Sequence, residues 1–233
     1  SRKVRLSGGG RYAVYALVVS LTLFLVVKAM APAYADLHLR KGIECIRVKD
    51  WQEAEWAFKK AASLVENEEY LMWLGDFYLR RAEWNPGRDG KLFYLALAVE
   101  TFQRAKMVNP LDELAYICLG EVYLYGAGLD KTYFDSAIGE FKEALKIDPN
   151  YYRIHRLLGL AYLGRGDVAE AVEHLEVAVS LHPRVAHSYI LLGDAYRESG
   201  LKDKAVKAYE KALELNPAAH GARRALEELL NTE

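Results

Sequence analysis

The chain has 233 residues, of which 52% are hydrophobic and 27% are charged, so it is not a disordered tail. Lys and Arg total 31 and Asp and Glu total 32, which leaves a formal net charge of -1. Because there is no basic surplus, nucleic-acid binding driven by phosphate neutralisation has little support. Two cysteines exclude a disulfide-stapled scaffold and a four-cysteine zinc site. The small numbers of glycines (17) and prolines (6) indicate a helical chain with sparse breaks.

An apolar segment without charge lies near the start of the chain. Residues 1–11 are basic, and residues 12–27 then contain no charged residue. As a helix this run spans about 24 Å, and extension to Ala31 gives about 20 residues, the usual length for crossing roughly 30 Å of hydrocarbon. We therefore predict a basic arm over 1–11 and a single transmembrane helix over 12–31. The predicted anchor residues are Tyr12, Tyr15, Leu21, Phe24 and Lys28.

Two other interpretations of this segment stay open. A cleaved signal peptide also has a basic start, an apolar run and a small-residue exit, which Ala33-Tyr34-Ala35 would supply. A core helix of a soluble domain fits less well, because the run has no polar face at a period of 3.6 residues. Basic residues lie on both sides of the run, so the positive-inside rule discriminates little. The order of a basic arm followed by an apolar helix favours a cytoplasmic N-terminus and an extracytoplasmic remainder.

Two sequence markers recur along the rest of the chain. The first is Leu-Gly with Tyr three residues after the Gly, and the second combines two small Ala residues, a large residue between them and a Pro. The first marker occurs at Leu74-Gly75 with Tyr78, Leu119-Gly120 with Tyr123, Leu158-Gly159 with Tyr162, and Leu192-Gly193 with Tyr196. The second occurs at Ala98-Phe102-Ala105-Pro110, Ala137-Phe141-Ala144-Pro149, Ala171-Leu175-Ala178-Pro183 and Ala205-Tyr209-Ala212-Pro217, and a weaker copy has Gly42, Ala54, Phe58 and Ala61.

The last two copies are 34 residues apart, and the pattern resembles the tetratricopeptide repeat family over about residues 35–219. The resemblance implies an all-α fold, in which the single transmembrane helix precedes a right-handed α-solenoid of about five helix pairs and a C-terminal capping helix. We expect Gly to permit close approach of helices A and B, large residues to fill the space beside it, and Pro to occupy the first turn of the next helix. The expected units are about 35–67, 68–112, 113–151, 152–185 and 186–219, followed by the cap at 220–233.

Two insertions interrupt the period. The first lies within residues 79–97, where we expect helix A to continue to about Trp84, a turn over 85–90, and helix B to restart near Lys91. The second lies within residues 126–132 and partly resembles the loop of Sel1-like relatives. Either insertion is a binding edge or neutral loop drift. Trp84, at the first tip, is the predicted second contact site.

In the family that the chain resembles, helices A line a concave groove that holds a partner segment. The middle of this predicted groove is apolar with spaced charges, which suits an amphipathic helix or an extended segment with aliphatic anchors. Leu39 and Ile43 stand where some relatives have a Lys/Asn carboxylate clamp, so capture of a chain-terminal carboxylate is not expected. The predicted groove residues are Met72, Asp76, Arg80, Leu114, Ile117, Glu121, Tyr125, Arg153, Arg156, Leu160, Ile190, Asp194 and Arg197.

Arg153 and Arg156 are one helical turn apart. They can pair with an acidic residue of a partner, or they form an ordinary solvated face.

The sequence contains no catalytic constellation. Its six histidines lack the spacing of a metal site, and Cys45 and Cys118 fall in units that are not neighbours. We therefore expect no enzyme activity, cofactor, metal, nucleic acid or small-molecule substrate.

The predicted function is a membrane-anchored protein-interaction scaffold that assembles or stabilises a membrane or periplasmic multi-subunit complex. Its partners would be protein subunits of that complex and the membrane, with the repeats on the extracytoplasmic side of a bacterial inner membrane. The alternative is a cytosol-facing receptor that recruits soluble client proteins to a membrane.

Overall fold

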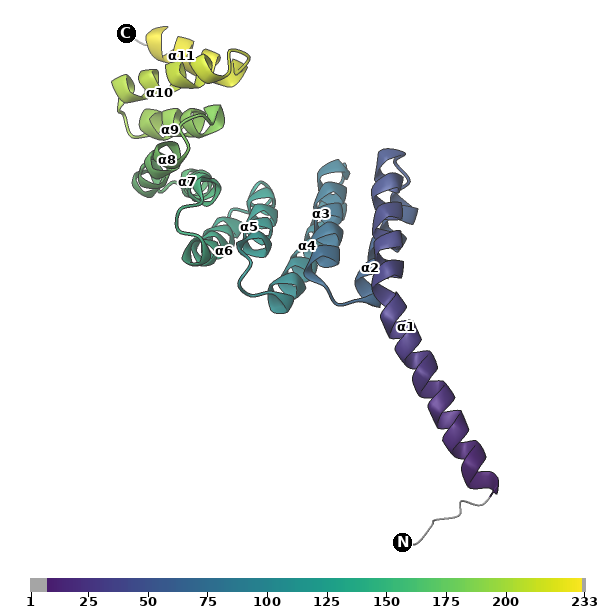
Figure 1. The fold of residues 1–233 in the computed structure, drawn as a ribbon. Helices are drawn as coiled ribbons and strands as arrows, with labels where there is room; N and C mark the ends of the chain where they lie inside the picture. The colour runs from purple at the N-terminus through teal and green to yellow at the C-terminus, as the bar shows by residue number, and fades with distance from the viewer. Residues whose placement is uncertain (1–7, 232–233) are drawn as a thin grey trace. The chain divides into compact units, whose positions relative to one another are not determined.

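The computed structural model describes the backbone of residues 8–231 and the side chains of residue 13 and residues 15–231. Within this range the chain forms eleven α-helices and no strand, which confirms the prediction of an all-α fold (Figure 1). The helices are α1 Gly8–Arg47, α2 Trp51–Leu64, α3 Glu68–Trp84, α4 Arg88–Val108, α5 Glu113–Ala127, α6 Tyr133–Ile147, α7 Tyr152–Arg165, α8 Val168–Leu181, α9 Ala186–Glu198, α10 Lys202–Leu215 and α11 His220–Asn231.

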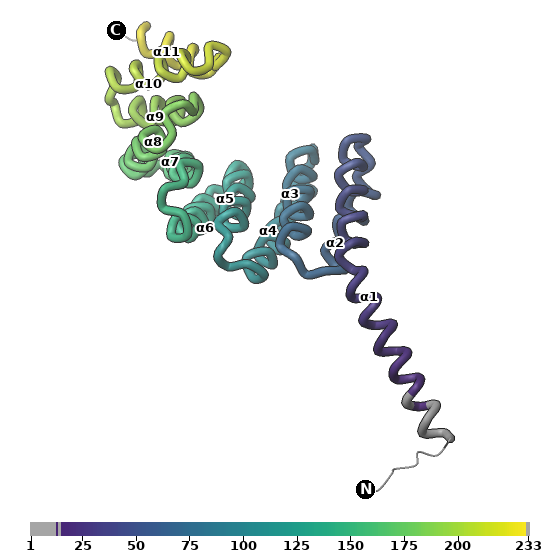
Figure 2. The backbone as a smooth tube through the Cα atoms, viewed as in Figure 1, coloured from purple at the N-terminus to yellow at the C-terminus, as the bar shows by residue number. Residues whose placement is uncertain are grey.

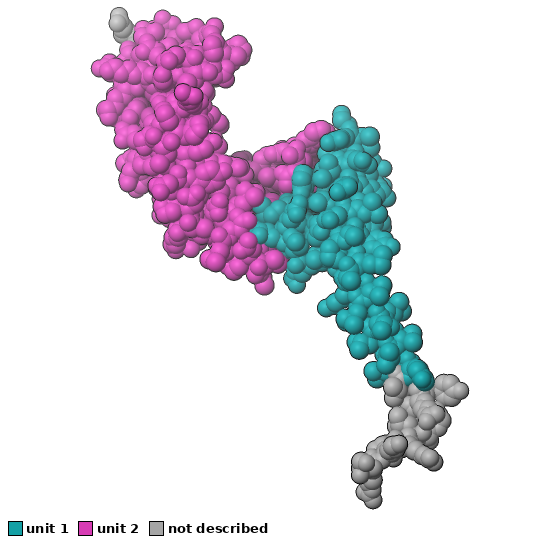
Figure 3. Space-filling model, in the orientation of Figure 1, with its two compact units in different colours: residues 1–74 teal, residues 75–233 magenta. Residues whose placement is uncertain are grey.

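The chain forms two compact units, drawn in teal and magenta in Figure 3. The first ends at Leu74 and the second begins at Gly75, so the division falls inside α3. Each unit is described below by itself.

In the first unit, α1 is one helix of 40 residues with Pro32 inside it. The purple tube of α1 runs without a break toward α2 in Figure 2. The predicted transmembrane helix and the first helix of the repeat array are therefore parts of the same helix. Of the predicted basic arm, residues 1–7 lie outside the described residues and residues 8–11 belong to α1.

The C-terminal half of α1 packs as one member of a helix pair. Gly42 lies against the ring of Phe58 on α2, where a Cβ would come within 2.7 Å of a ring carbon. The hydroxyl of Tyr70 donates a hydrogen bond of 2.7 Å to Asp36, which ties α1 to the start of α3. Asp50 caps α2 by accepting from the backbone N–H of Glu53. These contacts place the weaker first copy of the repeat in a helix pair.

The second unit stacks successive helices around the recurring glycines. An ideal Cβ on Gly75 would lie 2.6 Å from the ring of Phe102, and one on Gly193 would lie 2.6 Å from the ring of Tyr209. Each glycine thus contacts the large residue of the second marker directly. From the sequence, the large residue was expected to lie beside the glycine. The same contact joins Gly120 to Phe141 and Gly159 to Leu175, and the first alanines Ala98, Ala137, Ala171 and Ala205 are all fully buried.

The prolines of the turns between repeat units do not lie where they were expected from the sequence. Asn109, Asp148 and Asn216 are C-caps, and each donates its backbone N–H to the carbonyl four residues earlier. The side chain of Asn216 then accepts from the N–H of Ala218, which forms a turn around Pro217. The prolines therefore lie in the turns just after the caps, and the prediction that they occupy the first turn of the next helix is wrong. Proline follows the cap because it cannot continue the preceding helix.

The two insertions contact each other. Helix α3 ends at Trp84 as predicted, whereas α4 begins at Arg88, earlier than the expected Lys91. A guanidinium N–H of Arg88 donates to the backbone carbonyl of Leu129 in the second insertion, at 3.3 Å. In the same region the hydroxyl of Tyr125 donates to the carbonyl of Ala82 at 3.4 Å. The insertions therefore brace neighbouring helix pairs, and the resemblance of the second one to a Sel1-like loop is not confirmed.

The last helix covers the end of the array. Ala222 and Ala225 are buried, and Leu226 and Leu229 pack against the core cluster that runs through α5 to α11. Arg224 on the opposite side is exposed and pairs with Glu228. An apolar face against the stack and a charged face toward solvent are what a terminal helix requires.

Candidate protein-interaction surface

Four charged or titratable residues meet across the first helices of three consecutive pairs. A guanidinium N–H of Arg153 on α7 donates to Oε1 of Glu121 on α5 at 2.6 Å. One turn further along α7, Nη1 of Arg156 lies 3.5 Å from Nδ1 of His187 on α9. We call the surface formed by these four residues the α5–α7–α9 face. Three of the predicted groove residues, Glu121, Arg153 and Arg156, are therefore linked in a row with His187.

The two arginines of this face have different partners. Arg153 and Glu121 are each about one third exposed, so their ion pair is partly shielded from water. Burial acts to lower the pKa of Arg153, but the hydrogen bond and charge of Glu121 raise it overall. Burial and the neighbouring charge of Arg153 instead lower the pKa of Arg156. Among the described residues, no carboxylate lies within 4.0 Å of Arg156.

His187 shares the electrostatic environment of Arg156. Burial and the positive charge of Arg156 lower the pKa of His187, and Asp194 acts in the opposite direction. At neutral pH His187 is therefore uncharged and does not repel the guanidinium.

Other predicted groove residues on the second unit also carry internal contacts. Asp76 and Arg80 form an ion pair at 2.7 Å on α3. Asp194 lies 3.3 Å from Arg197 and accepts a hydrogen bond of 2.7 Å from the hydroxyl of Tyr209. Leu160 and Ile190 are half-buried, Leu114 is 40% exposed, and Met72 belongs to the first unit.

Two predicted groove residues have structural positions instead. Ile117 is fully buried within the core, so the prediction that it lines the groove is wrong. Helix α5 is apolar on nearly every side, and the repeat position alone did not distinguish its core face from its open face. Tyr125 is half-buried, and its hydroxyl is bonded to Ala82 while the ammonium group of Lys91 lies 5.9 Å from the centre of its ring. Tyr125 therefore contacts the first insertion.

An apolar pocket that the sequence did not reveal lies elsewhere on the second unit. It has a volume of about 570 Å³ and lies between α4, α5 and α6. Glu100 is the one residue of its lining that carries a carboxylate. The lengthened first insertion was the available signal, because it makes α4 a helix of 21 residues. The lining residues are Leu92, Leu95, Ala96, Val99, Glu100, Gln103, Val122, Tyr123, Gly126 and Tyr133.

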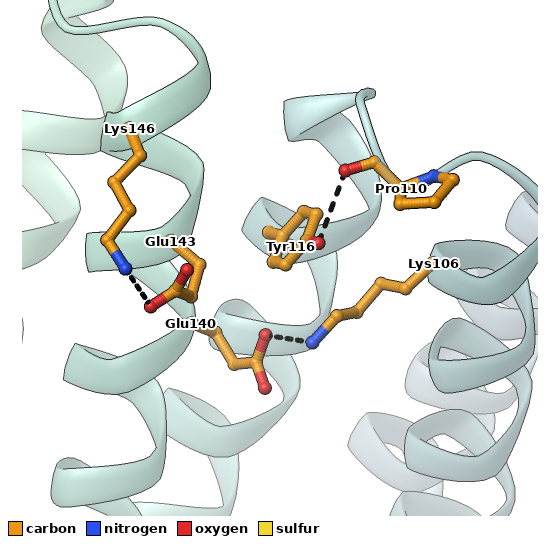
Figure 4. A network of polar contacts seen from close by, with 6 residues as sticks. All are labelled: Lys106, Pro110, Tyr116, Glu140, Glu143 and Lys146. Carbon is orange, nitrogen blue, oxygen red and sulfur yellow. Dashed lines mark hydrogen bonds and ion pairs between the residues drawn. The ribbon is translucent and has the colours of Figure 1, made fainter.

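Polar contacts hold α4 to α6 nearby. The ammonium group of Lys106 on α4 donates a hydrogen bond of 2.6 Å to Glu140 on α6, a contact drawn as a dashed line in Figure 4. The same ammonium group lies 4.4 Å from the ring centre of Tyr116, whose hydroxyl donates to the carbonyl of Pro110 at 3.2 Å. These side chains connect helices of consecutive pairs.

Trp84, the predicted second contact, is 58% exposed at the end of α3.

The apolar part of α1 is exposed along its length. Tyr15 is 69% exposed, Leu21 is 52% exposed and Phe24 is 55% exposed, and the ammonium group of Lys28 lies 5.4 Å from the ring centre of Phe24. The side chain of Tyr12 lies outside the described side chains. By length and composition this helix can cross a membrane, and none of its most apolar window is buried within the protein.

Outside the α5–α7–α9 face, two histidines and the two cysteines have packing contacts or buried positions. His155 and His174 approach to 3.1 Å between their Nδ1 atoms, and Nε2 of His155 lies 3.1 Å from the carbonyl of Pro149. Both cysteines are free, and burial raises the pKa of Cys118 to about 12. Within the described residues, no group of three or more His, Cys, Asp or Glu side chains is arranged to hold a metal ion.

Stacked helix pairs with a recurring Gly–large contact define an all-α helical-repeat protein. Residues 129–186, 156–220 and 190–230 match the family model of the tetratricopeptide repeat. Over residues 129–230 the chain is therefore similar to the tetratricopeptide repeat family.

Solved structures of the same fold cover most of the chain. The MamA protein has a TM-score of 0.62 and 25% identity, over 79% of this chain and 92% of that protein. TTC0263, a protein of Thermus thermophilus, has a TM-score of 0.61 and 25% identity, over 84% of this chain and 98% of that protein. YrrB, with a TM-score of 0.60 and 16% identity over 82% and 90%, shares the fold. A search of curated proteins finds no match to the sequence.

Proposed function

We propose that this chain is a membrane-anchored scaffold that assembles or stabilises a multi-subunit complex through its repeats. The observation that carries the proposal is the exposure of the apolar half of α1 in a chain whose other helices pack in pairs. Apolar side chains gain about 25 cal/mol for each Å² removed from water, and nothing in the described chain covers these. A lipid bilayer is the environment that matches the length and composition of the helix.

The continuity of α1 supports anchoring close to the membrane. The apolar half passes through Pro32 into the half that packs on α2, and Ala35 and Leu39 are already buried. The first helix pair therefore begins within a few residues of the proposed span. We propose the extracytoplasmic side for the repeats, following the order of basic arm and apolar helix.

The α5–α7–α9 face supports an interaction role. Its charged residues lie on helices whose opposite sides form the core, so they are available without unfolding. Of the proteins with this fold, YrrB is described as having a peptide-binding site. We propose that the α5–α7–α9 face of this chain binds a segment of a partner subunit.

The anchor is tested by charge substitution in the full chain. Leu21→Arg combined with Phe24→Arg should move the protein from the membrane fraction to the soluble fraction after alkaline extraction, since each Arg costs about 3 kcal/mol at the centre of a span. Leu37→Arg is the matched control, because Leu37 is 60% exposed on the same helix beyond the apolar run. Retention of the double variant in the membrane would refute the anchor.

The side of the membrane and the partner are tested separately. A cysteine introduced at the exposed Ser180 should react with an impermeant maleimide in intact cells, and protection until lysis would favour the cytosol-facing receptor.

A photo-crosslinker at Leu160 on α7 should trap a protein subunit. The same crosslinker at Leu201, which is 44% exposed at the start of α10, should not. Equal crosslinking at both positions would count against the face.

A further inference from the structure

Three carboxylates on the first helices of the pairs in the second compact unit have partners within the chain. Glu121 is bonded to Arg153, and Asp76 is bonded to Arg80. Asp194 accepts from Tyr209 and lies beside Arg197. Arg156 is left with the uncharged ring of His187 as its polar neighbour, although it is half-buried and one turn from a second arginine. A partly desolvated cation without an anion is an unfavourable arrangement that an added carboxylate would relieve.

We propose that Arg156, with His187 beside it, receives the carboxylate of a Glu or Asp side chain from the bound partner segment. This inference rests on the proposed function and specifies the chemistry of the partner. Guanidinium groups suit this role because their planar N–H groups match the two oxygens of a carboxylate. Leu160, four residues after Arg156, lies on the same side of α7 and is half-buried. The partner segment therefore carries an acidic residue close to an aliphatic one.

The neighbouring Arg153 has a different role, because Glu121 already neutralises it. Glu121 restricts the face to one open cation. Replacing Glu121 by Gln releases the Arg153 guanidinium and offers an acidic segment a second donor group.

Protonation of His187 on binding of the partner segment distinguishes this site from a general attraction between opposite charges. The charged groups that act on the pKa of His187 are Arg156 from α7 and Asp194 from α9 itself. A carboxylate placed between Arg156 and His187 favours the protonated imidazole. Binding of an acidic segment therefore takes up a proton and tightens as the pH falls from about 7.5 to about 6.

The test begins with a random 12-residue peptide library displayed on phage and selected on the full chain in detergent. Wild-type protein should enrich peptides with Asp or Glu next to an aliphatic residue, and Arg156→Gln should lose that preference. Arg104→Gln is the matched control, because it removes one exposed positive charge on α4, away from the face. Circular dichroism checks that each variant retains its helices.

Selected peptides are then synthesised with Glu and with Gln at the enriched position. The acidic peptide should bind wild type about 10- to 100-fold more tightly than its Gln form, a difference that Arg156→Gln removes and Arg156→Lys partly restores. Glu121→Gln should strengthen binding of the acidic peptide. The pH dependence of its affinity should disappear in His187→Gln.

The outcomes separate this inference from the proposed function. Peptides that compete with crosslinking at Leu160 but show no acidic preference would overturn the inference and leave the interaction role intact. An acidic preference that survives Arg156→Gln would also overturn it. If no peptide binds and no partner crosslinks at Leu160, both proposals fail.

Discussion

The contact between Gly193 and Tyr209 offers a direct test of the packing rule that builds the repeat. The substitution is Gly193→Ala, which adds a single methyl group to α9. An ideal Cβ at this position would lie 2.6 Å from Cε1 and 2.7 Å from Cδ1 of Tyr209. Ordinary carbon–carbon contacts are about 3.5–4.0 Å, so the ring would have to retreat by about 1 Å.

The surroundings of Tyr209 oppose that movement. Its side chain is fully buried, and its hydroxyl donates a hydrogen bond of 2.7 Å to Asp194, one residue after the glycine. Overpacking costs about 1–3 kcal/mol, and weakening a hydrogen bond to a charged acceptor adds about 1.5 kcal/mol. Ala gains about 1 kcal/mol over Gly as a helix former. The net loss of stability is therefore about 2 kcal/mol, equivalent to about 4–8 °C in melting temperature.

The matched control is Gly139→Ala on α6. Gly139 is also inside a helix, but it is exposed and a Cβ there would meet no atom within 4 Å. This variant should therefore be more stable by up to about 1 kcal/mol. Thermal melts followed by circular dichroism compare the two, and hydrogen exchange should localise the loss in Gly193→Ala to α9 and α10. Equal or greater stability of Gly193→Ala than of wild type would refute the close-packing argument.

Two further predictions concern burial. Ile117→Asp should destabilise the protein by about 3–5 kcal/mol, because it places a charge in the core, whereas Leu160→Asp should cost at most about 1 kcal/mol. Urea denaturation followed by circular dichroism measures both losses of stability, and a stable Ile117→Asp would contradict the assigned core. Burial and then the charge of His155 hold the pKa of His174 below its ordinary 6.5, so the unfolded chain binds more protons just below pH 6.5. The stability that this histidine contributes is thus full above pH 6.5 and falls as the pH drops below it. Melting temperatures from about pH 7.5 to about pH 5 should fall less steeply in His174→Asn than in wild type, and identical slopes would show that His174 does not titrate in this way.

The helix pairs were predictable because each repeat solves the same packing problem. The recurring markers identified the glycines and the large residues of each repeat, such as Gly75 with Phe102 and Gly193 with Tyr209. Their direct contact was not predicted, because the large residue was expected beside the close approach of the two helices. The end of α3 at Trp84 was also predictable, since Asn-Pro-Gly follows it.

Other features depended on information that the repeat pattern does not contain. The continuity of α1 through Pro32 was not predicted, because the apolar run and the first repeat copy are separate patterns in the sequence. The bond between Arg88 and Leu129 joins residues that are 41 positions apart, so no local pattern reveals it. The pairing of Glu121 with Arg153 likewise needs the distance between α5 and α7, which the register places together without fixing side-chain contacts.

The difference between Ile117 and Arg156 explains where binding chemistry can reside in this fold. Every helix pair must keep its Gly–large contact and its buried residues, or the stack loses its core. Core packing therefore determines which residues are tolerated at positions such as Ile117, whatever their place in the repeat register. The residues of the α5–α7–α9 face lie outside that requirement, so they can change without disturbing the stack. The chain uses this freedom to neutralise Arg153 and leave Arg156 without a carboxylate, and this asymmetry is what a partner carrying a single acidic residue would recognise.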